Sequence, residues 1–161
     1  MKVKKYVLDT SVIVEYIDEE SPYRDNLERL FDDIDNGSLK AYVSTMTLSE
    51  VLYVASRIYR NAGMAEPNKE ARIYVEWLVN KPGIEVVEIS KEIGILAGEI
   101  RKKVRISLVD CTVLAAAKIM NARPLFLKKE KEMESFIDTL LSEYEIEFLV
   151  CLLYTSDAAD E

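Results

Sequence analysis

The sequence predicts an α/β protein of three layers, α/β/α, in which helices cover both faces of a central parallel sheet of about five strands. Short runs of apolar and β-branched residues alternate along the chain with longer segments whose apolar residues recur at helical spacing. That alternation is typical of parallel sheets, because two parallel strands need a long crossover connection, usually a helix. The chain has 161 residues, of which 49% are hydrophobic. This length and apolar content suit one compact domain.

Five segments have the composition of strands. Each is short and rich in Val, Ile, Leu, Phe or Tyr, and helical patterns separate them. In chain order, the expected strands are 3–8, 40–44, 84–89, 124–127 and 146–150. In an open sheet of this kind the active site lies beyond the carboxyl ends of the strands. The residues that follow the strands are therefore the first candidates for chemistry.

The segments between the strands have helical patterns with recognisable ends. Leu27, Leu30, Phe31 and Ile34 fall on one face of a helix that ends at Asn36-Gly37, a typical C-cap. In chain order, the expected helices cover 11–17, 21–36, 47–59, 68–79, 90–104, a segment from 107, and 130–142.

The composition excludes several classes of enzyme. The chain contains no histidine, which excludes Ser-His-Asp and Cys-His catalysis, histidine general bases and histidine-ligated zinc. The formal net charge of −8 argues against a simple basic surface for nucleic acid. The N-terminus does not resemble a signal peptide, and no apolar run approaches the roughly 20 residues of a membrane helix. We therefore expect a cytoplasmic protein that does not span a membrane.

The last residues, CLLYTSDAADE at 151–161, break the preceding pattern. They resemble the translation of a sequencing adapter read in frame, so we expect a native domain over 1–150 followed by a non-native tail. Without the three acids of the tail, 21 basic and 26 acidic residues remain, a net charge of −5. Cys111 is then the single cysteine, which excludes an intrachain disulfide and favours a reducing compartment.

Three acids lie near the starts of expected helices: Asp9, Glu50 and Asp110. Each also has a purely structural interpretation, Asp9 as an N-cap and the other two as the acids of capping boxes, Thr47-x-x-Glu50 and Ser107-x-x-Asp110. Helix N-termini favour negative charge, and a cation would hold three such carboxylates together at one sheet edge against their repulsion. Oxygen-only ligands favour Mg²⁺ or Mn²⁺ over zinc.

Three segments together resemble the acidic motifs of PIN-domain ribonucleases. Their order and spacing match in VLDTS at 7–11, TLSEV at 47–51 and SLVDC at 107–111. The resemblance covers residues 1 to about 150 and is nearest to VapC-type toxins of toxin–antitoxin pairs. Many members have a Thr-x-Asp segment after the fourth strand, where this chain has LKKEKE at 127–132. Glu130 is the natural replacement there, and we expect it to matter less than the three other acids.

The resemblance implies a PIN-like endoribonuclease that hydrolyses RNA phosphodiester bonds with Mg²⁺ or Mn²⁺. It implies that the metal lies on Asp9 and Asp110, with Glu50 bound directly or through water. Ser11 would orient a water, and Glu130 would be a fourth catalytic acid. The resemblance to toxins also implies a cognate antitoxin and a homodimer. Two alternatives are a PIN nuclease that processes RNA without being a toxin, and a catalytically weak PIN module that binds RNA.

Two further groups of residues have both a functional and a structural interpretation. Apolar residues on the helices between the second and third strands belong either to the core or to a partner surface: Leu52, Tyr53, Tyr59, Tyr74 and Trp77. Basic residues just before the third motif and around Glu130 bind phosphates or are solvated helix ends: Arg101, Lys102, Lys103 and Arg105, and Lys128, Lys129 and Lys131.

Other α/β families fit less well. Haloacid-dehalogenase-type phosphatases need a second acid two residues after the first, where this chain has Ser11. A response-regulator receiver needs an acceptor Asp after a middle strand, and the third expected strand ends in Glu88-Ile89-Ser90. A dinucleotide-binding domain needs G-x-G-x-x-G, which is missing from a chain with five glycines.

Overall fold

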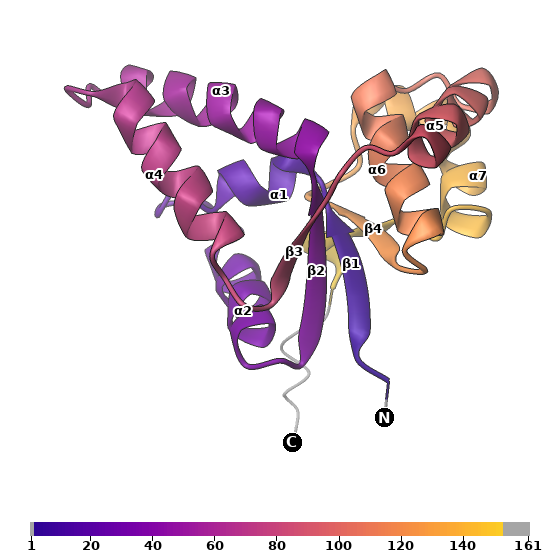
Figure 1. Ribbon diagram of the computed structural model, residues 1–161, viewed down its shortest axis with the longest axis horizontal. Helices are drawn as coiled ribbons and strands as arrows, with labels where there is room; N and C mark the ends of the chain where they lie inside the picture. The colour runs from indigo at the N-terminus through magenta and orange to yellow at the C-terminus, as the bar shows by residue number, and fades with distance from the viewer. Residues whose placement is uncertain (1, 153–161) are drawn as a thin grey trace.

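The computed structural model describes residues 2–152, which form a five-stranded parallel sheet between two layers of helices (Figure 1). This confirms the expected fold class. The strand order is β3-β2-β1-β4-β5, and every neighbouring pair is parallel. The strands are β1 (Lys4–Leu8), β2 (Leu39–Ser44), β3 (Ile84–Val87), β4 (Arg123–Phe126) and β5 (Glu147–Phe148).

The order of the strands creates a switch point beside β1. From β1 the chain moves outward through β2 and β3, and it later returns to place β4 on the other side of β1. The register pairs Val7 with Tyr42 on one side and with Pro124 on the other. Ligands of open parallel sheets bind at such a point, beyond the carboxyl ends of the strands. Asp9, the residue that follows β1, therefore lies where a site is expected.

The helices divide between the two faces of the sheet. The first four lie on one side and the next three on the other (Figure 1). They are α1 (Thr10–Glu15), α2 (Arg24–Asp35), α3 (Thr45–Asn61), α4 (Pro67–Val79), α5 (Lys91–Lys103), α6 (Leu108–Ile119) and α7 (Ile137–Ser142).

Alternate residues of the strands supply two separate cores, because successive strand side chains point to opposite faces. Tyr6 and Leu8 of β1 pack with Leu27, Phe31 and other residues of the first group of helices. Val7, between them, packs in the second core with α5, α6 and α7. All three strand residues are fully buried. Both faces of β1 are thus covered, as in a doubly wound sheet.

Several element boundaries differ from the sequence-based expectation. The segment expected as a helix over 130–142 begins instead as a 3-10 helix, η1 (Lys131–Phe136), and becomes α-helical only in α7. The second helix begins at Arg24 rather than 21. The last strand has two residues and leads into a short 3-10 helix, η2 (Leu149–Cys151).

Most of the expected foreign tail, 151–161, lies outside the described residues. Of its two described members, Cys151 is exposed and Leu152 packs against the first core. Within residues 2–152, none of the helices combines the length and the apolar character needed to cross a membrane.

Candidate active site

Asp9 is both a helix cap and a member of an acidic site. It has extended backbone angles at the N-cap of α1, and its Oδ2 accepts a hydrogen bond from the Ser11 N–H at 2.9 Å. The residue is 5% exposed. Burial raises the pKa of its carboxyl, the hydrogen bonds from Ser11 lower it, and the charge of Glu50 raises it further. The structural interpretation of Asp9 is therefore correct, and it does not exclude a second role.

Glu50 does not belong to a capping box, so that interpretation of it is wrong. Helix α3 begins two residues earlier than expected, and its N-cap is Ser44, whose Oγ accepts from the Thr47 N–H at 3.0 Å. Glu50 therefore lies in the second turn, free of the helix end. Its Oε1 accepts a hydrogen bond from Thr10 Oγ1 at 2.5 Å. This contact directs the Glu50 carboxylate toward the start of α1, beside Asp9.

Asp110 lies in the first turn of α6, whose N-cap is Ser107. The Ser107 Oγ accepts from the Asp110 N–H at 3.0 Å, so the expected helix start is confirmed. The residue is 9% exposed. Burial, and next the negative charges of Asp9, Glu130 and Glu50, raise the pKa of Asp110 to about 8. A carboxyl so placed favours either a proton or a cation at neutral pH.

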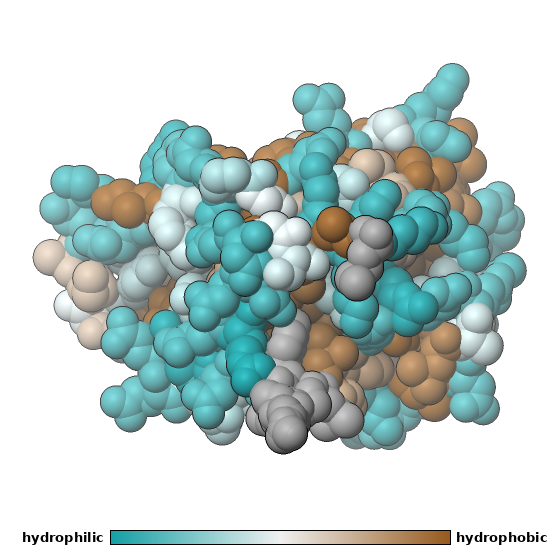
Figure 2. All heavy atoms as spheres, turned by 90° about the horizontal axis from the view of Figure 1, so that it is seen from below, coloured by the Kyte–Doolittle hydropathy of each residue, from teal (hydrophilic) through white to brown (hydrophobic). Residues whose placement is uncertain are grey.

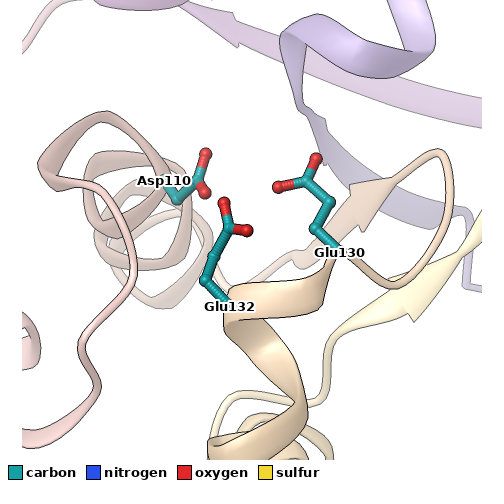
Figure 3. Close-up of side chains that lie close together, drawn as sticks. All are labelled: Asp110, Glu130 and Glu132. Carbon is teal, nitrogen blue, oxygen red and sulfur yellow. The ribbon is translucent and has the colours of Figure 1, made fainter.

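Glu130 and Glu132 lie on the segment that follows β4, and their carboxylates complete the group beside Asp110 (Figure 3). Glu130 precedes η1, Glu132 lies in its first turn, and both point toward Asp110. One carboxylate oxygen from each of these three residues lies within 4.8 Å of the others. Glu130 is partly buried, and burial followed by the charge of Asp9 raises its pKa to about 7. Sequence reasoning missed Glu132, although the alternation Glu130-Lys131-Glu132 was a signal for it.

Ser11, in the first turn of α1, connects the chain after β1 to the chain after β4. Its Oγ accepts a hydrogen bond from the Leu127 N–H, 116 residues away, at 3.0 Å. Leu127 directly follows β4, so this bond fixes the segment that leads to Glu130. The predicted role of Ser11 in orienting a water stays a prediction, and the structure adds a positioning role.

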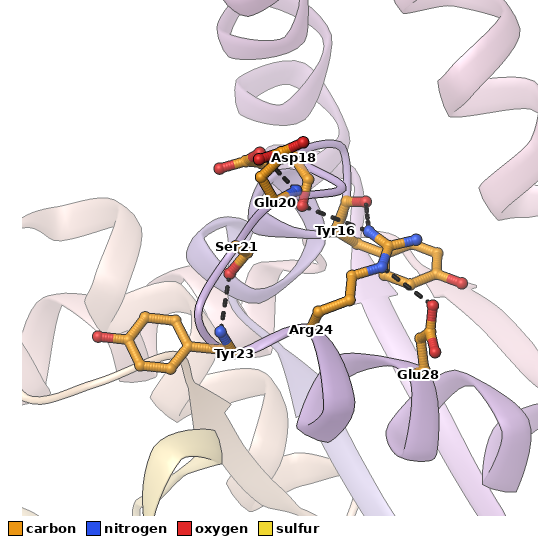
Figure 4. A network of polar contacts seen from close by, with 7 residues as sticks. All are labelled: Tyr16, Asp18, Glu20, Ser21, Tyr23, Arg24 and Glu28. Carbon is orange, nitrogen blue, oxygen red and sulfur yellow. Dashed lines mark hydrogen bonds and ion pairs between the residues drawn. The ribbon is translucent and has the colours of Figure 1, made fainter.

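The segment between α1 and α2 is held by a compact polar network (Figure 4). Arg24 Nη1 donates to the Tyr16 carbonyl at 2.7 Å, Arg24 Nε pairs with Glu28 at 3.0 Å, and the guanidinium lies 4.4 Å from the centroid of the Tyr16 ring. At its other side, α1 is fixed by the partly buried Tyr74, whose hydroxyl donates to the Ile13 carbonyl at 2.6 Å. The helix that carries Asp9 at its start is thus tied to two other helices.

The five carboxylates repel one another and lack basic partners. Within residues 2–152, no lysine or arginine forms an ion pair with any of them. Two oxygens bound to one Mg²⁺ lie at most about 4.2 Å apart, since each is about 2.1 Å from the ion. The 4.8 Å limit for Asp110, Glu130 and Glu132 therefore needs only a small closure around a cation. The all-oxygen donor set fits Mg²⁺ or Mn²⁺.

The expected basic clusters differ in how far their charges are neutralised. On α5, Lys102 pairs with Glu99 at 3.0 Å and Lys103 pairs with Glu143 at 2.8 Å. The lysines interleaved with the acids at 128–131 are exposed, and none of them forms an ion pair within the described part of the chain. Lys128 Nζ lies 5.9 Å from the centroid of the Tyr23 ring. These lysines are available to an anionic ligand at the site.

Comparison with known proteins gives the same fold. A family model described as "PIN domain" matches residues 6–136. No curated protein matches the chain. Among solved structures, DNA-bound VapBC from Salmonella typhimurium has a TM-score of 0.62 at 17% identity, covering 91% of this chain and 99% of that one. VapC20 from Mycobacterium tuberculosis, a "Sarcin-Ricin loop cleaving toxin", has a TM-score of 0.60 at 13% identity, covering 81% and 94%. FitAcB from Neisseria gonorrhoeae has a TM-score of 0.58 at 16% identity, covering 91% and 99%. At these identities, the likeness shows the fold alone.

Proposed function

The chain belongs to the PIN domain family, and we propose that it is a metal-dependent endoribonuclease that hydrolyses RNA phosphodiester bonds. One observation carries the proposal. Carboxylates from the N-cap of α1, the second turn of α3, the first turn of α6 and the start of η1 lie near one another at the switch point of the sheet, and within residues 2–152 no basic side chain forms an ion pair with them. A cluster of this kind is unfavourable in a folded protein unless it binds a cation.

The proposed metal ligands are Asp9, Glu50 and Asp110, and the geometry adds Glu130 and Glu132 to the candidates. A bound Mg²⁺ or Mn²⁺ would polarise the phosphodiester and lower the pKa of a water for in-line attack, leaving a 5′-phosphate and a 3′-hydroxyl. Thr10 holds Glu50 in place through its hydroxyl, and Ser11 holds the β4 end near Asp9. These two contacts fix the spacing of acids that come from distant parts of the chain.

The lysines at 128, 129 and 131 support an anionic substrate. They flank Glu130 and Glu132 and have no acidic partner in the described part of the chain. Phosphate contacts by such lysines would offset the repulsion between the acids and the RNA backbone. Unpaired RNA is the expected substrate, because a phosphate in a flexible strand reaches a site at a sheet edge more easily than one in a duplex.

We further propose that the nuclease is a toxin that forms a homodimer and binds a protein antitoxin. The support is the likeness to VapBC complexes together with exposed apolar residues on α3 and α4. Tyr53 is 57% exposed and Ile73 is 53% exposed. Tyr74 belongs to the core side of these helices, since its hydroxyl is bonded to Ile13. A cytoplasmic location follows from the same proposal, because RNA is the substrate.

The test is cleavage of an end-labelled structured RNA by purified protein with Mg²⁺ or Mn²⁺ and with excess chelator. Asp9→Asn is compared with Asp138→Asn, which removes an exposed carboxylate on α7. We expect metal-dependent cleavage that Asp138→Asn retains. Asp9→Asn should lose more than the roughly 10–100-fold that follows loss of a residue merely supporting a metal ligand. Binding of RNA without cleavage by the wild type would instead favour the catalytically weak module.

A further inference from the structure

A cavity of about 980 Å³ opens at the amino-terminal edge of the sheet, opposite the acids. It is bordered by the start of β1, the end of α6 and the segment 143–145 that leads from α7 to β5. Figure 2 views the molecule from this edge, where hydrophobic atoms are visible between hydrophilic side chains. Val3, Leu114 and Ala117 supply apolar surface to the cavity.

The charge of this cavity is opposite to that of the whole chain. The full sequence has 21 basic and 29 acidic residues. Around the cavity the balance is reversed, since two acids, Glu143 and Glu145, accompany five basic residues. The basic residues are Lys2, Lys4, Lys5, Lys118 and Arg123.

The acids of the cavity already have basic partners, whereas the lysines of the N-terminal segment have no acidic partner among the described residues. Glu143 pairs with Lys103 at 2.8 Å, and Glu145 pairs with Arg123 at 3.4 Å. Lys118 Nζ donates to the Glu143 carbonyl at 3.3 Å and forms no ion pair within the described residues. In the part of the chain that the structure describes, the lysines at 2, 4 and 5 form no ion pair. The cavity therefore favours an anion.

We propose that this cavity binds phosphate groups of an RNA strand, at a distance from the acidic site. The inference rests on the proposed function, because it takes the RNA substrate as the source of the phosphates. Lysines that neutralise phosphates release counterions, which gives an affinity that does not depend on sequence. The volume is at the upper end of the roughly 300–1,000 Å³ of small-molecule pockets. With basic groups on β1, α6 and β4, the cavity fits several phosphates better than one compact anion.

The distance between the two sites predicts a dependence on RNA length. The five residues of β1 separate the edges of the sheet by about 17 Å, at about 3.3 Å per residue. A stacked strand advances about 3.4 Å per nucleotide, as in a duplex, so a stacked RNA needs about five nucleotides to span this distance. A path around the protein surface needs more. Short RNAs therefore contact one site at a time, and long RNAs contact both.

The experiment measures binding of fluorescent single-stranded RNAs of four and 24 nucleotides by anisotropy, in excess chelator to prevent cleavage. The test variant is Lys2→Gln/Lys5→Gln. The matched control, Lys69→Gln/Lys91→Gln, removes two exposed lysines that lie outside the cavity. We expect the test variant to bind the 24-mer about tenfold more weakly at low salt. The plot of the logarithm of the association constant against the logarithm of the salt concentration should be less steep for the test variant. Its slope should be smaller in magnitude by about 1.4, since each of two lost phosphate contacts contributes about 0.7. The control should match the wild type.

Several outcomes would overturn the inference. The inference fails if the two double variants bind the 24-mer with equal affinity and equal salt slope. It also fails if the test variant loses binding to poly-glutamate or to a mononucleotide while its binding to the 24-mer is unchanged. Should Lys5→Gln lower the melting temperature, Lys2→Gln/Lys118→Gln tests the same cavity without altering β1. The binding assay contains no metal and no cleavage step. Failure of the nuclease assay and failure of this inference are therefore separate results.

Discussion

Replacing Asp110 by asparagine should stabilise the metal-free protein at neutral pH. In the unfolded chain this carboxyl loses its proton near pH 3.8, whereas in the folded protein its pKa is about 8. Between these values the folded state holds more protons than the unfolded state, so the free energy of unfolding falls as pH rises. The loss is complete only above pH 8. An uncharged amide at this position has no proton to lose and would show no such dependence.

The magnitude follows from the distance between the two pKa values. Each pKa unit corresponds to about 1.4 kcal/mol, and at pH 7 the carboxyl that is ionised in the unfolded chain must take up a proton on folding, which lowers the stability of the wild type by at most about 4 kcal/mol. Neighbouring carboxylates share the repulsion, and the amide gives up about 0.3–1 kcal/mol of favourable interaction with the start of α6. We expect a net gain of about 2–3 kcal/mol. For a chain of this size, that gain raises the melting temperature by about 5–10 °C.

The assay is urea and thermal unfolding in excess chelator from pH 5 to pH 9, for the wild type, Asp110→Asn and the surface control Asp138→Asn. The gain for Asp110→Asn should grow with pH, and the control should follow the wild type. Added Mn²⁺ should reverse the order, because the wild type keeps its charged ligand. A metal-free Asp110→Asn protein that is less stable than the wild type at pH 8 would refute the idea that burial and repulsion disfavour the Asp110 carboxylate.

Ser11→Ala should lower the free energy of unfolding by about 1–3 kcal/mol in urea titrations, because it leaves the N–H of the buried Leu127 without its acceptor; a loss below the experimental error would mean that water replaces the hydroxyl. Glu130→Gln should weaken Mn²⁺ binding less than Asp110→Asn does, since Glu130 is less buried, and equal losses in a calorimetric titration would show that the ranking is wrong. Deleting residues 153–161 should leave the melting temperature unchanged, and a fall of several degrees would show that this segment is native and packed.

The fold was predictable because its signals are local and repeated. Apolar runs and helical patterns each depend on neighbouring residues, and the parallel arrangement follows from their alternation. The same reasoning brought Asp9 and Asp110 together: Asp9 directly follows β1, and Asp110 opens α6, which leads back into the parallel strand β4 and therefore starts at the same edge of the sheet. Their convergence required no knowledge of individual contacts.

The start of α3 and the role of Glu132 were not predicted, because the local sequence allows more than one structure at each place. Ser44 and Thr47 are both good N-caps, and the end of β2 at Ser44 decides which of them begins α3. Because α3 begins after Ser44, Glu50 is not part of a capping box, and its carboxylate accepts a hydrogen bond from Thr10. Glu132 stood in a run of charges that resembles a solvated surface, and only the tertiary structure places it opposite Asp110. Contacts between residues far apart in the sequence determined both outcomes.

The carboxylates of Asp9, Glu50, Asp110, Glu130 and Glu132 are proposed to form one binding site for a divalent cation. Calorimetric titration of Mn²⁺ into the chelator-free wild type, Asp9→Asn, Asp110→Asn and Asp138→Asn measures whether they do. We predict saturable binding by the wild type and Asp138→Asn, and at least about a tenfold loss of affinity for each of the two other variants. Unchanged Mn²⁺ affinity in both Asp9→Asn and Asp110→Asn would contradict the claim.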